Sequence, residues 1–489
     1  MERYLSGKTV WMLAWMLACG AAQAQETGGR VGVWLTTGDQ SHLLAHEADL
    51  QLGPVTRPLT PWSPGVETAA ALPAPPLAID IDAAQRHQRM VGFGAAVSAS
   101  SAWLIARLEP ERRRALLAEL FGPSPGLSLG FARVSIGASD FALSHYTYDD
   151  LPAGQTDAGL AQFSVEADRA FLLPLLQDAL ALNPALQIVA SPWSAPAWMK
   201  SNDSLVQGTL KPEAYESYAR YLKRYADIYL EEGVPIYALT LQNEPHAEPP
   251  DSPGMRLDEA ARAQLIGKHL GPLLESDGPR ILEWDGNWDR PQAPLKVLAD
   301  KAAGPYVAGV AWHCYGGDVG AQEAVRAAYP AKEVYVTECS GGKWAPAWRD
   351  NLTHFARTLI VGAARNWAKG VVLGNLALDE QGGPHAGGCR DCRGVVTLRA
   401  DGGVQRNVEY YALAHASRFV QPGAWRVASS VGSDGVDSVA FLNPDRSLAL
   451  IAVNSAARAR TFNVRAAGRG FSYTLPAASV VTLTWQSAP

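Results

Sequence analysis

The sequence predicts an α/β fold, a (β/α)8 TIM barrel with an attached β-sandwich domain. From residue 80 to residue 404, apolar runs of strand length alternate with helical stretches, and Gly, Pro or polar residues separate them. From residue 405 to residue 489 the helical pattern fades, and apolar runs joined by turn residues take its place. The 489 residues are enough for one large barrel and a second, smaller domain.

Eight apolar runs predict the barrel strands. One helix between them is clear, because Tyr and Leu side chains recur every three or four residues from Tyr215 to Tyr229, after Pro212 and before Gly233. In chain order, the predicted strands are Val91–Val97, Ala132–Ile136, Leu186–Ala190, Ile236–Leu241, Arg280–Trp284, Val307–Trp312, Glu333–Thr337 and Gly370–Leu373.

The segments outside the barrel have a different pattern. The runs Ser438–Leu442 and Leu448–Val453 are joined by Asn443-Pro444-Asp445 and predict a hairpin of the β-sandwich. Residues 25–79 are rich in Gly, Pro and Thr, with the short apolar run Val31–Leu35. Within that segment, Leu72–Leu77 is typical of a linker.

The first 24 residues are typical of a secretory signal peptide. Arg3 and Lys8 precede the apolar run Thr9–Gly20, and Ala22-Gln23-Ala24 is an A-x-A cleavage site, so we expect cleavage after Ala24 and a secreted or periplasmic protein. The run is too short for a membrane span, which needs roughly 20 residues. A lipoprotein signal is the alternative, because Leu17–Gly20 partly resembles a lipobox.

Composition narrows the class of partner. The net charge of −6 offers no basic surface for nucleic acid, so we expect none. The chain has 15 tryptophans, and indole faces are common where sugar rings are bound because they stack on apolar C–H faces. Composition therefore favours a carbohydrate or glycoconjugate partner.

Four cysteines remain after signal cleavage: Cys314, Cys339, Cys389 and Cys392. The C-x-x-C pair at 389 and 392 is compatible with half a zinc site, a redox motif or a small disulfide. No second C-x-x-C or matching His pair follows, and the pair lies in a Gly-rich loop rather than a βαβ unit. In an exported protein a loop disulfide is favoured. We expect no metal ion and no organic cofactor.

Two glutamates follow predicted barrel strands. Glu244 stands in Gln242–Pro245 after the fourth strand, and Glu338 stands in Thr337–Ser340 after the seventh. Because catalytic residues of such barrels lie where the strands end, both carboxylates should lie on one rim. Glycoside hydrolysis needs such a pair, one to protonate the leaving oxygen and one to attack carbon or activate water. The alternative is a chance pair of glutamates in structural salt bridges.

Other side chains at the strand ends suit the same chemistry. Arg133, in the second strand, is predicted to hold a carboxylate in its charged form. Tyr315, after the sixth strand, is placed to donate a hydrogen bond to the nucleophile. The remaining candidates are Trp193 and Trp198 as stacking faces, His313 as a structural histidine, and Trp284, Asp285, Trp288 and Asp289, which either flank the site or pack in the core.

The segment Gly126–Gly130 matches the G-x-S-x-G pattern of serine hydrolases. That motif must follow a strand and open a helix, whereas here it follows a Gly/Pro loop and precedes a strand. We therefore reject a serine hydrolase. The sequence also contains no P-loop and no convincing dinucleotide-binding fingerprint.

Seven motifs between residues 80 and 485 carry a family resemblance. They are Gln88–Gly94, Arg133–Phe141, Ser191–Asn202, Leu239–Pro245, Trp312–Tyr315, Thr337–Ser340 and Asn375–Pro384. With these motifs the chain resembles glycoside hydrolase family 30, which includes the lysosomal acid glucosylceramidase and bacterial relatives. The resemblance implies a barrel with a β-sandwich built from both chain ends, to which residues 25–79 would contribute.

The resemblance also implies roles for site residues. Glu244 would be the acid/base and Glu338 the nucleophile of a retaining, double-displacement mechanism. Asn243 would hold the sugar 2-hydroxyl. The mechanism requires the higher pKa on Glu244 and a charged Glu338. The side chains that would line the subsite of the cleaved sugar are Arg133, Trp193 and Tyr315.

Two departures from the family pattern fall on sugar recognition. An Asp that binds distal hydroxyls of glucose is replaced by Ala99, and a Trp expected before Asn375 is replaced by Gly374. We therefore expect a secreted retaining β-glycosidase with an altered sugar pocket, related to enzymes of sphingolipid metabolism. The alternatives are an endo-acting glycanase of the xylanase or β-1,6-glucanase type and a non-catalytic carbohydrate-binding barrel.

Overall fold

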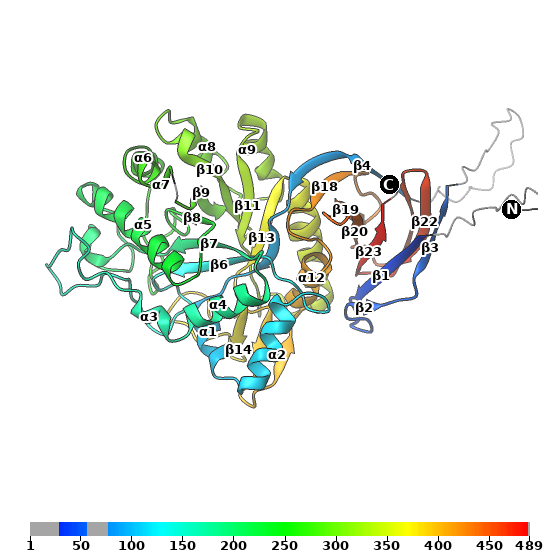
Figure 1. The fold of residues 1–489 in the computed structure, drawn as a ribbon, viewed down its shortest axis with the longest axis horizontal. Helices are drawn as coiled ribbons and strands as arrows, with labels where there is room; N and C mark the ends of the chain where they lie inside the picture. The colour runs from blue at the N-terminus through cyan, green and yellow to red at the C-terminus, as the bar shows by residue number, and fades with distance from the viewer. Residues whose placement is uncertain (1–28, 56–76, 277, 488–489) are drawn as a thin grey trace, which may run out of the picture.

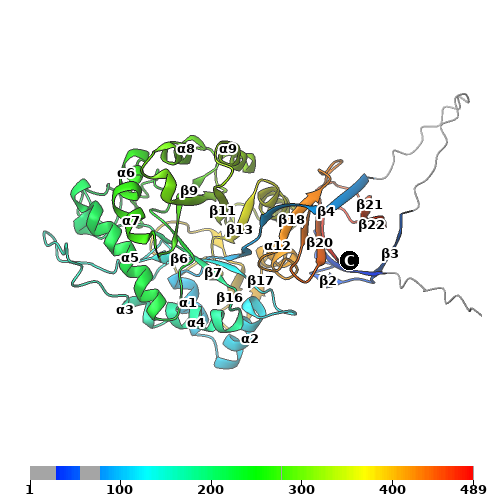
Figure 2. The ribbon, with the colours of Figure 1, turned by 45° about the horizontal axis from the view of Figure 1, so that its top comes forward.

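The computed structural model describes residues 29–55, 77–276 and 278–487. A barrel and a β-sandwich lie side by side, with helix α12 (Val408–Ser417) between them (Figures 1 and 2). The predicted signal peptide, its lipobox alternative and nearly all of the linker Leu72–Leu77 lie outside the described residues. None of the helices in the described ranges is long and apolar enough to cross a membrane.

The barrel confirms all eight predicted strands, each within a few residues of its predicted ends. The strands run parallel, and each pairs with the next in chain order. Between the first and second strands, Val97 N donates to the Arg133 carbonyl oxygen over 2.8 Å and completes the barrel. The strands are β5 (Gly92–Ala95), β6 (Phe131–Ile136), β7 (Gln187–Pro192), β8 (Ala238–Thr240), β9 (Arg280–Asn287), β10 (Val307–His313), β11 (Glu333–Glu338) and β13 (Ala368–Leu373).

Helices follow the strands around the outside of the barrel. The predicted helix after the third strand is α5, which begins at Tyr215 after a 3-10 turn at Pro212–Ala214 and ends at Glu231. The others are α1 (Ala99–Ala106), α2 (Pro110–Phe121), α3 (Glu166–Arg169), α4 (Leu172–Leu182), α6 (Glu259–Leu265), α7 (Gly271–Leu274), α8 (Gln292–Ala299), α9 (Gln322–Ala328), α10 (Trp348–His354) and α11 (Ala363–Arg365). Wider helical turns at Ile266–Leu270 and Phe355–Gly362 join α6 to α7 and α10 to α11.

The barrel interior is packed with side chains. Its core consists of alanine, branched aliphatic and aromatic residues contributed by all eight strands or their immediate ends: Ala96, Phe131, Val189, Ala238, Leu282, Ala311, Tyr335 and Val372. At the amino ends of the strands, Glu333 pairs with Arg280 and Lys369. Because the interior is filled, the chemistry is left to the opposite rim, where the strands end.

The sandwich takes strands from both ends of the described chain. Strand β3 pairs with both β22 and β1, so the ten-stranded sheet closes on itself around its own apolar core. The strands are β1 (Gly29–Thr37), β2 (Ala45–His46), β3 (Leu50–Pro54), β4 (Leu77–Arg89), β18 (Trp425–Ser429), β19 (Val436–Leu442), β20 (Ser447–Asn454), β21 (Arg460–Ala466), β22 (Arg469–Leu475) and β23 (Ser479–Gln486).

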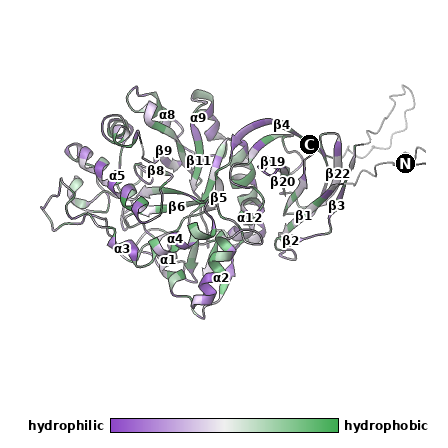
Figure 3. Ribbon diagram, in the orientation of Figure 1, coloured by the Kyte–Doolittle hydropathy of each residue, from purple (hydrophilic) through white to green (hydrophobic). Residues whose placement is uncertain are grey.

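Two elements differ from the predicted segmentation. Strand β4, largely hydrophilic in Figure 3, extends from residue 77 to residue 89 and pairs with sandwich strands β18 and β21, although residues 80–404 were predicted as barrel. Residues 408–417, predicted as part of the sandwich, form helix α12 instead. Nine of the ten residues of α12 are buried, so it lacks the single apolar face by which a sequence reveals a helix.

Two small sheets lie outside the barrel and the sandwich. One pairs β12 (Gly341–Gly342) with β15 (Cys392–Arg393), and the other combines β14 (Ala377–Asp379), β16 (Val396–Leu398) and β17 (Val404–Arg406). The first brings the loop after β13 beside the end of β11. The second lies against α1, where the Ser101 hydroxyl donates to the Ala377 carbonyl oxygen over 2.8 Å.

Gly94→Ala should destabilise the barrel where β5 meets β6. A Cβ at Gly94 would overlap the Phe131 carbonyl oxygen, which belongs to the neighbouring backbone and has little freedom to move. We expect a loss of about 3 kcal/mol in the free energy of unfolding, measured by urea denaturation. Gly53→Ala in β3 is the control, because no atom lies within 4 Å of the added Cβ. Equal losses for both variants would contradict the close approach.

Candidate active site

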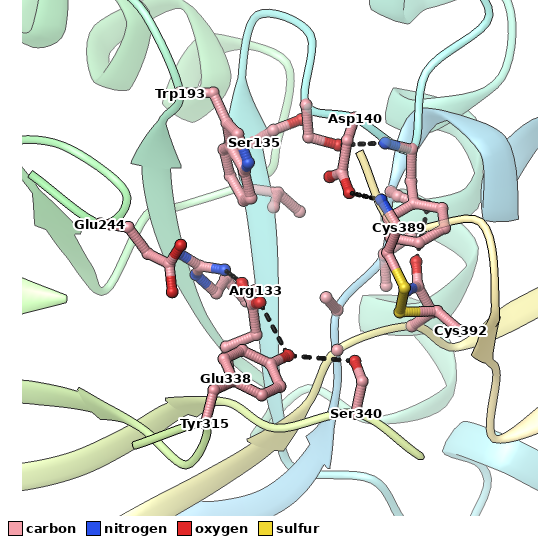
Figure 4. Close-up of a pocket in the computed structure, with 18 of the residues that line it drawn as sticks. Arg133, Ser135, Asp140, Trp193, Glu244, Tyr315, Glu338, Ser340, Cys389 and Cys392 are labelled. Atoms are coloured by element: carbon pink, nitrogen blue, oxygen red, sulfur yellow. Dashed lines mark hydrogen bonds and ion pairs between the residues drawn. A yellow bond between two sulfur atoms is a disulfide. The ribbon is translucent and has the colours of Figure 1, made fainter. Parts of the chain in front are cut away.

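A pocket of about 310 Å³ opens where the barrel strands end (Figure 4). It contains both glutamates singled out from the sequence, together with Arg133, Trp193 and Tyr315. The other residues that line it are Ala96, Val97, Ser98, Val134, Ser135, Ser139, Asp140, Phe141, Ser340, Trp344, Gly374, Asn375, Cys389 and Cys392. Asn243 lies in an adjoining hollow that also reaches Glu244 and Glu338.

Glu338, the last residue of β11, is held through both carboxylate oxygens. Arg133 Nη1 donates to Oε2, and the Tyr315 hydroxyl donates to Oε1 over 2.9 Å. Although part of the ring is exposed, desolvation of the phenol at the pocket wall and the charge of Glu338 raise the pKa of Tyr315 well above its usual value, so the phenol remains a donor. With a cation on one oxygen and a hydroxyl on the other, the carboxylate is held in one orientation at the pocket wall.

Arg133 connects the parts of the site. Its side chain is 1% exposed, and it donates to Ser191 Oγ over 3.2 Å, Asn243 Oδ1 over 2.7 Å and Asp285 Oδ2 over 2.8 Å, besides Glu338. Burial disfavours its charge, but the carboxylates of Asp285 and Glu338 outweigh burial and raise its pKa. Because Asn243 presents its oxygen to Arg133, its amide nitrogen is left to donate elsewhere.

Asp285, in β9, is the counter-charge at the centre of this cluster. Ser191, Thr240 and Thr337 donate hydroxyl hydrogen bonds of 2.7–2.8 Å to it, in addition to the bond from Arg133. Burial raises the pKa of Asp285, but Arg133, His313 and the hydroxyl donors hold the pKa far below its usual range. The sequence did not decide whether Asp285 flanks the site or packs in the core. In the structure it is a buried, permanently ionised carboxylate that anchors the site.

His313 has a larger part than the structural role that the sequence suggested. Its Nδ1 lies 3.2 Å from Glu244 Oε1, and its Nε2 lies 2.9 Å from Asp285 Oδ1. Burial lowers the pKa of His313, but Glu338, Asp285 and Glu244 outweigh burial and raise the pKa to about 9. At neutral pH His313 is an imidazolium that donates to both carboxylates.

The sequence predicted a raised pKa for Glu244, but the group with the raised pKa is His313. Burial favours the neutral form of Glu244, but the hydrogen bond and charge of His313, with the charge of Arg133, lower the pKa of Glu244. The Glu244–His313 pair thus holds one proton, and in the resting site it lies on the imidazole. Glu244 is placed by a backbone with φ of +45°, and its N–H donates to the Asp285 carbonyl oxygen over 2.9 Å.

Of the four tryptophans singled out from the sequence, one lines the pocket and three are buried. Trp193 lines the pocket, with the Arg133 guanidinium 4.7 Å from the centre of its ring. Trp198, considered as a second stacking face, is 8% exposed and donates its indole N–H to Asp149. Trp284 and Trp288 are each 3% exposed and belong to the core of the domain. Of the two tryptophans predicted as stacking faces, Trp193 is therefore the one that lines the pocket.

Two pocket residues, Asp140 and Trp344, were not singled out from the sequence. Asp140 follows β6, and burial together with the charge of Glu338 raises its pKa to about 7. Its Oδ2 accepts a hydrogen bond of 3.3 Å from Cys389 N. Ala99 begins α1 and does not line the pocket. The site therefore retains a carboxyl group besides the two glutamates, although position 99 carries none.

The four cysteines form two disulfides, both at the site. Cys389 is bonded to Cys392 in the loop that lines the pocket. Cys314 is bonded to Cys339, a pairing that the sequence analysis did not consider. This second bridge joins the residue before Tyr315 to the residue after Glu338. No cluster of His, Cys, Asp and Glu in residues 29–55, 77–276 and 278–487 is arranged to hold a metal ion.

Comparison with family models gives the family. The description "Glycosyl hydrolase family 30 TIM-barrel domain" matches residues 90–420, and "Glycosyl hydrolase family 30 beta sandwich domain" matches residues 423–483. The chain belongs to glycoside hydrolase family 30. It is therefore a glycoside hydrolase, and a non-catalytic barrel is set aside.

Several relatives of this family 30 chain carry names. It is 34% identical to Endo-1,6-beta-D-glucanase neg1 of Aspergillus fumigatus over 84% of this chain and 88% of the relative. It is 36% identical to Endo-1,6-beta-D-glucanase of Neurospora crassa over 76% of this chain and 79% of the relative. Identity to the lysosomal acid glucosylceramidase of Mus musculus is 28%, over 84% of each chain.

A solved structure with the same architecture is the endo-beta1,6-glucanase BT3312. The two superpose with a TM-score of 0.84 at 31% sequence identity, over 94% of this chain and 100% of that chain. The match therefore extends over both the barrel and the sandwich.

His313→Asn should move the basic limb of the pH profile. In the wild type, kcat/KM should fall above about pH 9, where the Glu244–His313 pair loses its proton. The variant leaves the proton to Glu244 alone, a carboxyl group, so the limb should move to lower pH and the maximum should fall by about 10-fold. His46→Asn in the sandwich is the control. An unchanged limb in His313→Asn would place the proton elsewhere.

Replacing both Cys314 and Cys339 with Ala should reduce stability and kcat together. The bridge spans 25 residues of chain, for which the loop-entropy model gives about 3.5 kcal/mol, and its loss frees Tyr315 beside Glu338. The matched control replaces Cys389 and Cys392 with Ala. That bridge spans 3 residues, for which the expected loss is about 1.6 kcal/mol. Equal losses of unfolding free energy would show that loop length does not govern the effect.

Proposed function

We propose that this protein is an exported, retaining endo-β-1,6-glucanase. The observation that carries the proposal is the pair Glu244 and Glu338 at the ends of β8 and β11, facing one pocket and held by the Arg133 cluster. The names of the relatives above support β-1,6-glucan as the substrate. This corresponds to the glycanase alternative from the sequence rather than to a glucosylceramidase. Identity to the mouse glucosylceramidase is 28%, which is lower than the identity to either fungal glucanase.

In the first step Glu338 is the nucleophile. One carboxylate oxygen attacks the anomeric carbon and forms a glycosyl ester as the bond from that carbon to the leaving oxygen breaks. The proton of the Glu244–His313 pair passes from His313 Nδ1 to Glu244 Oε1, and Glu244 gives it to the leaving oxygen, so the pair ends the step without that proton. Asn243, whose amide nitrogen is free to donate, binds the 2-hydroxyl.

In the second step the same pair works in reverse. Glycosylation removes the negative charge of Glu338, which is the largest electrostatic contribution that raises the pKa of His313. His313 has given up its proton in the first step, and its lowered pKa keeps it from taking another from solvent. Glu244 is therefore an unprotonated carboxylate that accepts a proton from water as the water oxygen attacks the anomeric carbon. The ester bond breaks, Glu338 is released as a carboxylate, and the sugar leaves with its original β configuration.

Export is the remaining part of the proposal. The features that support it are the Arg3 and Lys8 charges, the apolar run after them and the A-x-A site at Ala22–Ala24. Amino-terminal sequencing of the protein recovered from a secreting host should begin at residue 25.

The proposed function predicts the products and the roles of both glutamates. The wild type should release a ladder of short oligosaccharides from β-1,6-glucan at the earliest times, with the β anomer first by NMR. Glu338→Gln should lower kcat by about 10⁴-fold or more, because no carboxylate remains to form the ester. Glu275→Gln, an exposed glutamate at the end of α7, should retain full activity.

Glu244→Gln separates the acid from the nucleophile. It should lose activity on glucan but retain bond cleavage with a dinitrophenyl β-glycoside, whose leaving group needs no proton. An α-anomeric first product would exclude a retaining mechanism. Release of glucose alone from glucan, or hydrolysis of glucosylceramide in preference to glucan, would exclude the endo-glucanase.

A further inference from the structure

Trp344 is an exposed indole at the mouth of the catalytic pocket. It is 56% exposed and lines the same pocket as Glu338. Among the large exposed apolar side chains of the described ranges it is the one tryptophan, and Tyr315, 46% exposed, shares the pocket with it. Together the two rings give the mouth of the pocket an exposed apolar surface, and such a surface is typical of a ligand-binding groove.

The indole is fixed rather than free to turn away. A Cβ on Gly342 would overlap the Trp344 ring, so the ring lies directly on the backbone of that glycine. Gly342 itself pairs with Cys392 in the β12–β15 ribbon, next to the Cys389–Cys392 bridge. On either side, Lys343 N donates to the Asp391 carbonyl oxygen over 2.8 Å, and Ala345 N donates to that of Gly342 over 3.1 Å. These contacts hold the indole of Trp344 in one position, with its exposed surface at the mouth of the pocket.

The position of Trp344 selects one side of the cleaved bond. A second hollow, which Glu244 and Glu338 also line, extends along the segment after Glu244, from Ala247 to Gly254, and Trp344 does not line that hollow. Trp344 lies instead in the pocket with Ser340, Gly374 and Cys392. In a double displacement the sugar that becomes bonded to the nucleophile occupies this side.

Gly374 contributes no side chain to the part of the pocket that Trp344 also lines. A Cβ at residue 374 would overlap Ser340 Oγ, so a larger side chain there would displace Ser340 and narrow the space beside Trp344. A pocket that admits one terminal sugar is closed at this end. A pocket with no side chain at residue 374 and a fixed indole at Trp344 suits a glucan chain that continues past the cleaved sugar.

We propose that Trp344 stacks on the glucose ring next to the cleaved sugar, on its non-reducing side, and thereby favours attack within the glucan chain. This inference rests on the proposed function and adds the residue that binds the continuing chain. Stacking suits an indole because one face of a β-linked glucose ring is made of C–H groups.

Trp344→Ala should impair two-sugar substrates and spare one-sugar substrates. We expect kcat/KM for an aryl β-gentiobioside to fall about 10- to 100-fold, as for aromatic stacking elsewhere, while that for an aryl β-glucoside changes less than about 3-fold. Trp344→Phe should recover most of the gentiobioside rate. Leu230→Ala, at an exposed apolar side chain on α5, is the control for surface truncation.

A second measurement needs no turnover. Calorimetric titration of gentiotriose into Glu338→Gln, with and without Trp344→Ala, should show about 10-fold weaker binding when the indole is absent. Equal losses on glucoside and gentiobioside, or unchanged gentiotriose binding, would overturn the assignment while the glucanase activity of the wild type stood. A wild type that does not cleave β-1,6-glucan would overturn the proposed function, and the glucan subsite with it.

Discussion

The site depends on the buried guanidinium of Arg133. A charge with 1% exposure inside a barrel is unfavourable unless it is paired, and Asp285 and Glu338 supply the partners on two of its nitrogens. Removal of one partner from a buried pair costs about 3–5 kcal/mol because the other charge is left uncompensated. The same interaction therefore stabilises the rim and sets Glu338, Asn243 and Asp285 in place.

The same interaction determines where the proton shared by His313 and Glu244 lies. Asp285 is anchored as an anion by Arg133 and by hydroxyls from three strands, so its other oxygen attracts a cation, which His313 provides. The imidazolium in turn reaches Glu244. Two cations and three carboxylates thus alternate across the rim, and the group that titrates near pH 9 is the histidine between two of the carboxylates. A pair of glutamates alone would not give this arrangement.

Local patterns in the sequence account for what was predicted. Parallel barrel strands are buried on both faces, so they appear as apolar runs, and the residues that end them fall on one rim. Glu244, Glu338, Arg133, Trp193 and Tyr315 were found in this way, and the structure brings them into one pocket. Helix α12 was missed because it is buried on nearly all sides.

Other features depend on contacts between distant segments, which no local pattern reveals. The partners of His313 are 69 and 28 residues away, and Cys314 and Cys339 are 25 residues apart. Asp140 and Trp344 belong to loops that contact the disulfide loop after β13: Asp140 accepts a hydrogen bond from Cys389 N, and Gly342, two residues before Trp344, pairs with Cys392. Because polar residues after barrel strands fall on the rim, the sequence could have suggested Asp140, which follows β6. It could not have suggested Trp344, whose place depends on the pairing of β12 with β15.

In the proposed mechanism, Glu338 forms the covalent bond to the sugar. Incubation of the wild type with a 2-deoxy-2-fluoro-β-gentiobiosyl fluoride should trap that ester, because the fluorine slows the second step more than the first. Mass spectrometry of the intact protein should then show one added disaccharide, and peptide mapping should place it on the peptide that contains Glu338. A label on Glu244 or elsewhere, or inactivation without a label, would contradict the account.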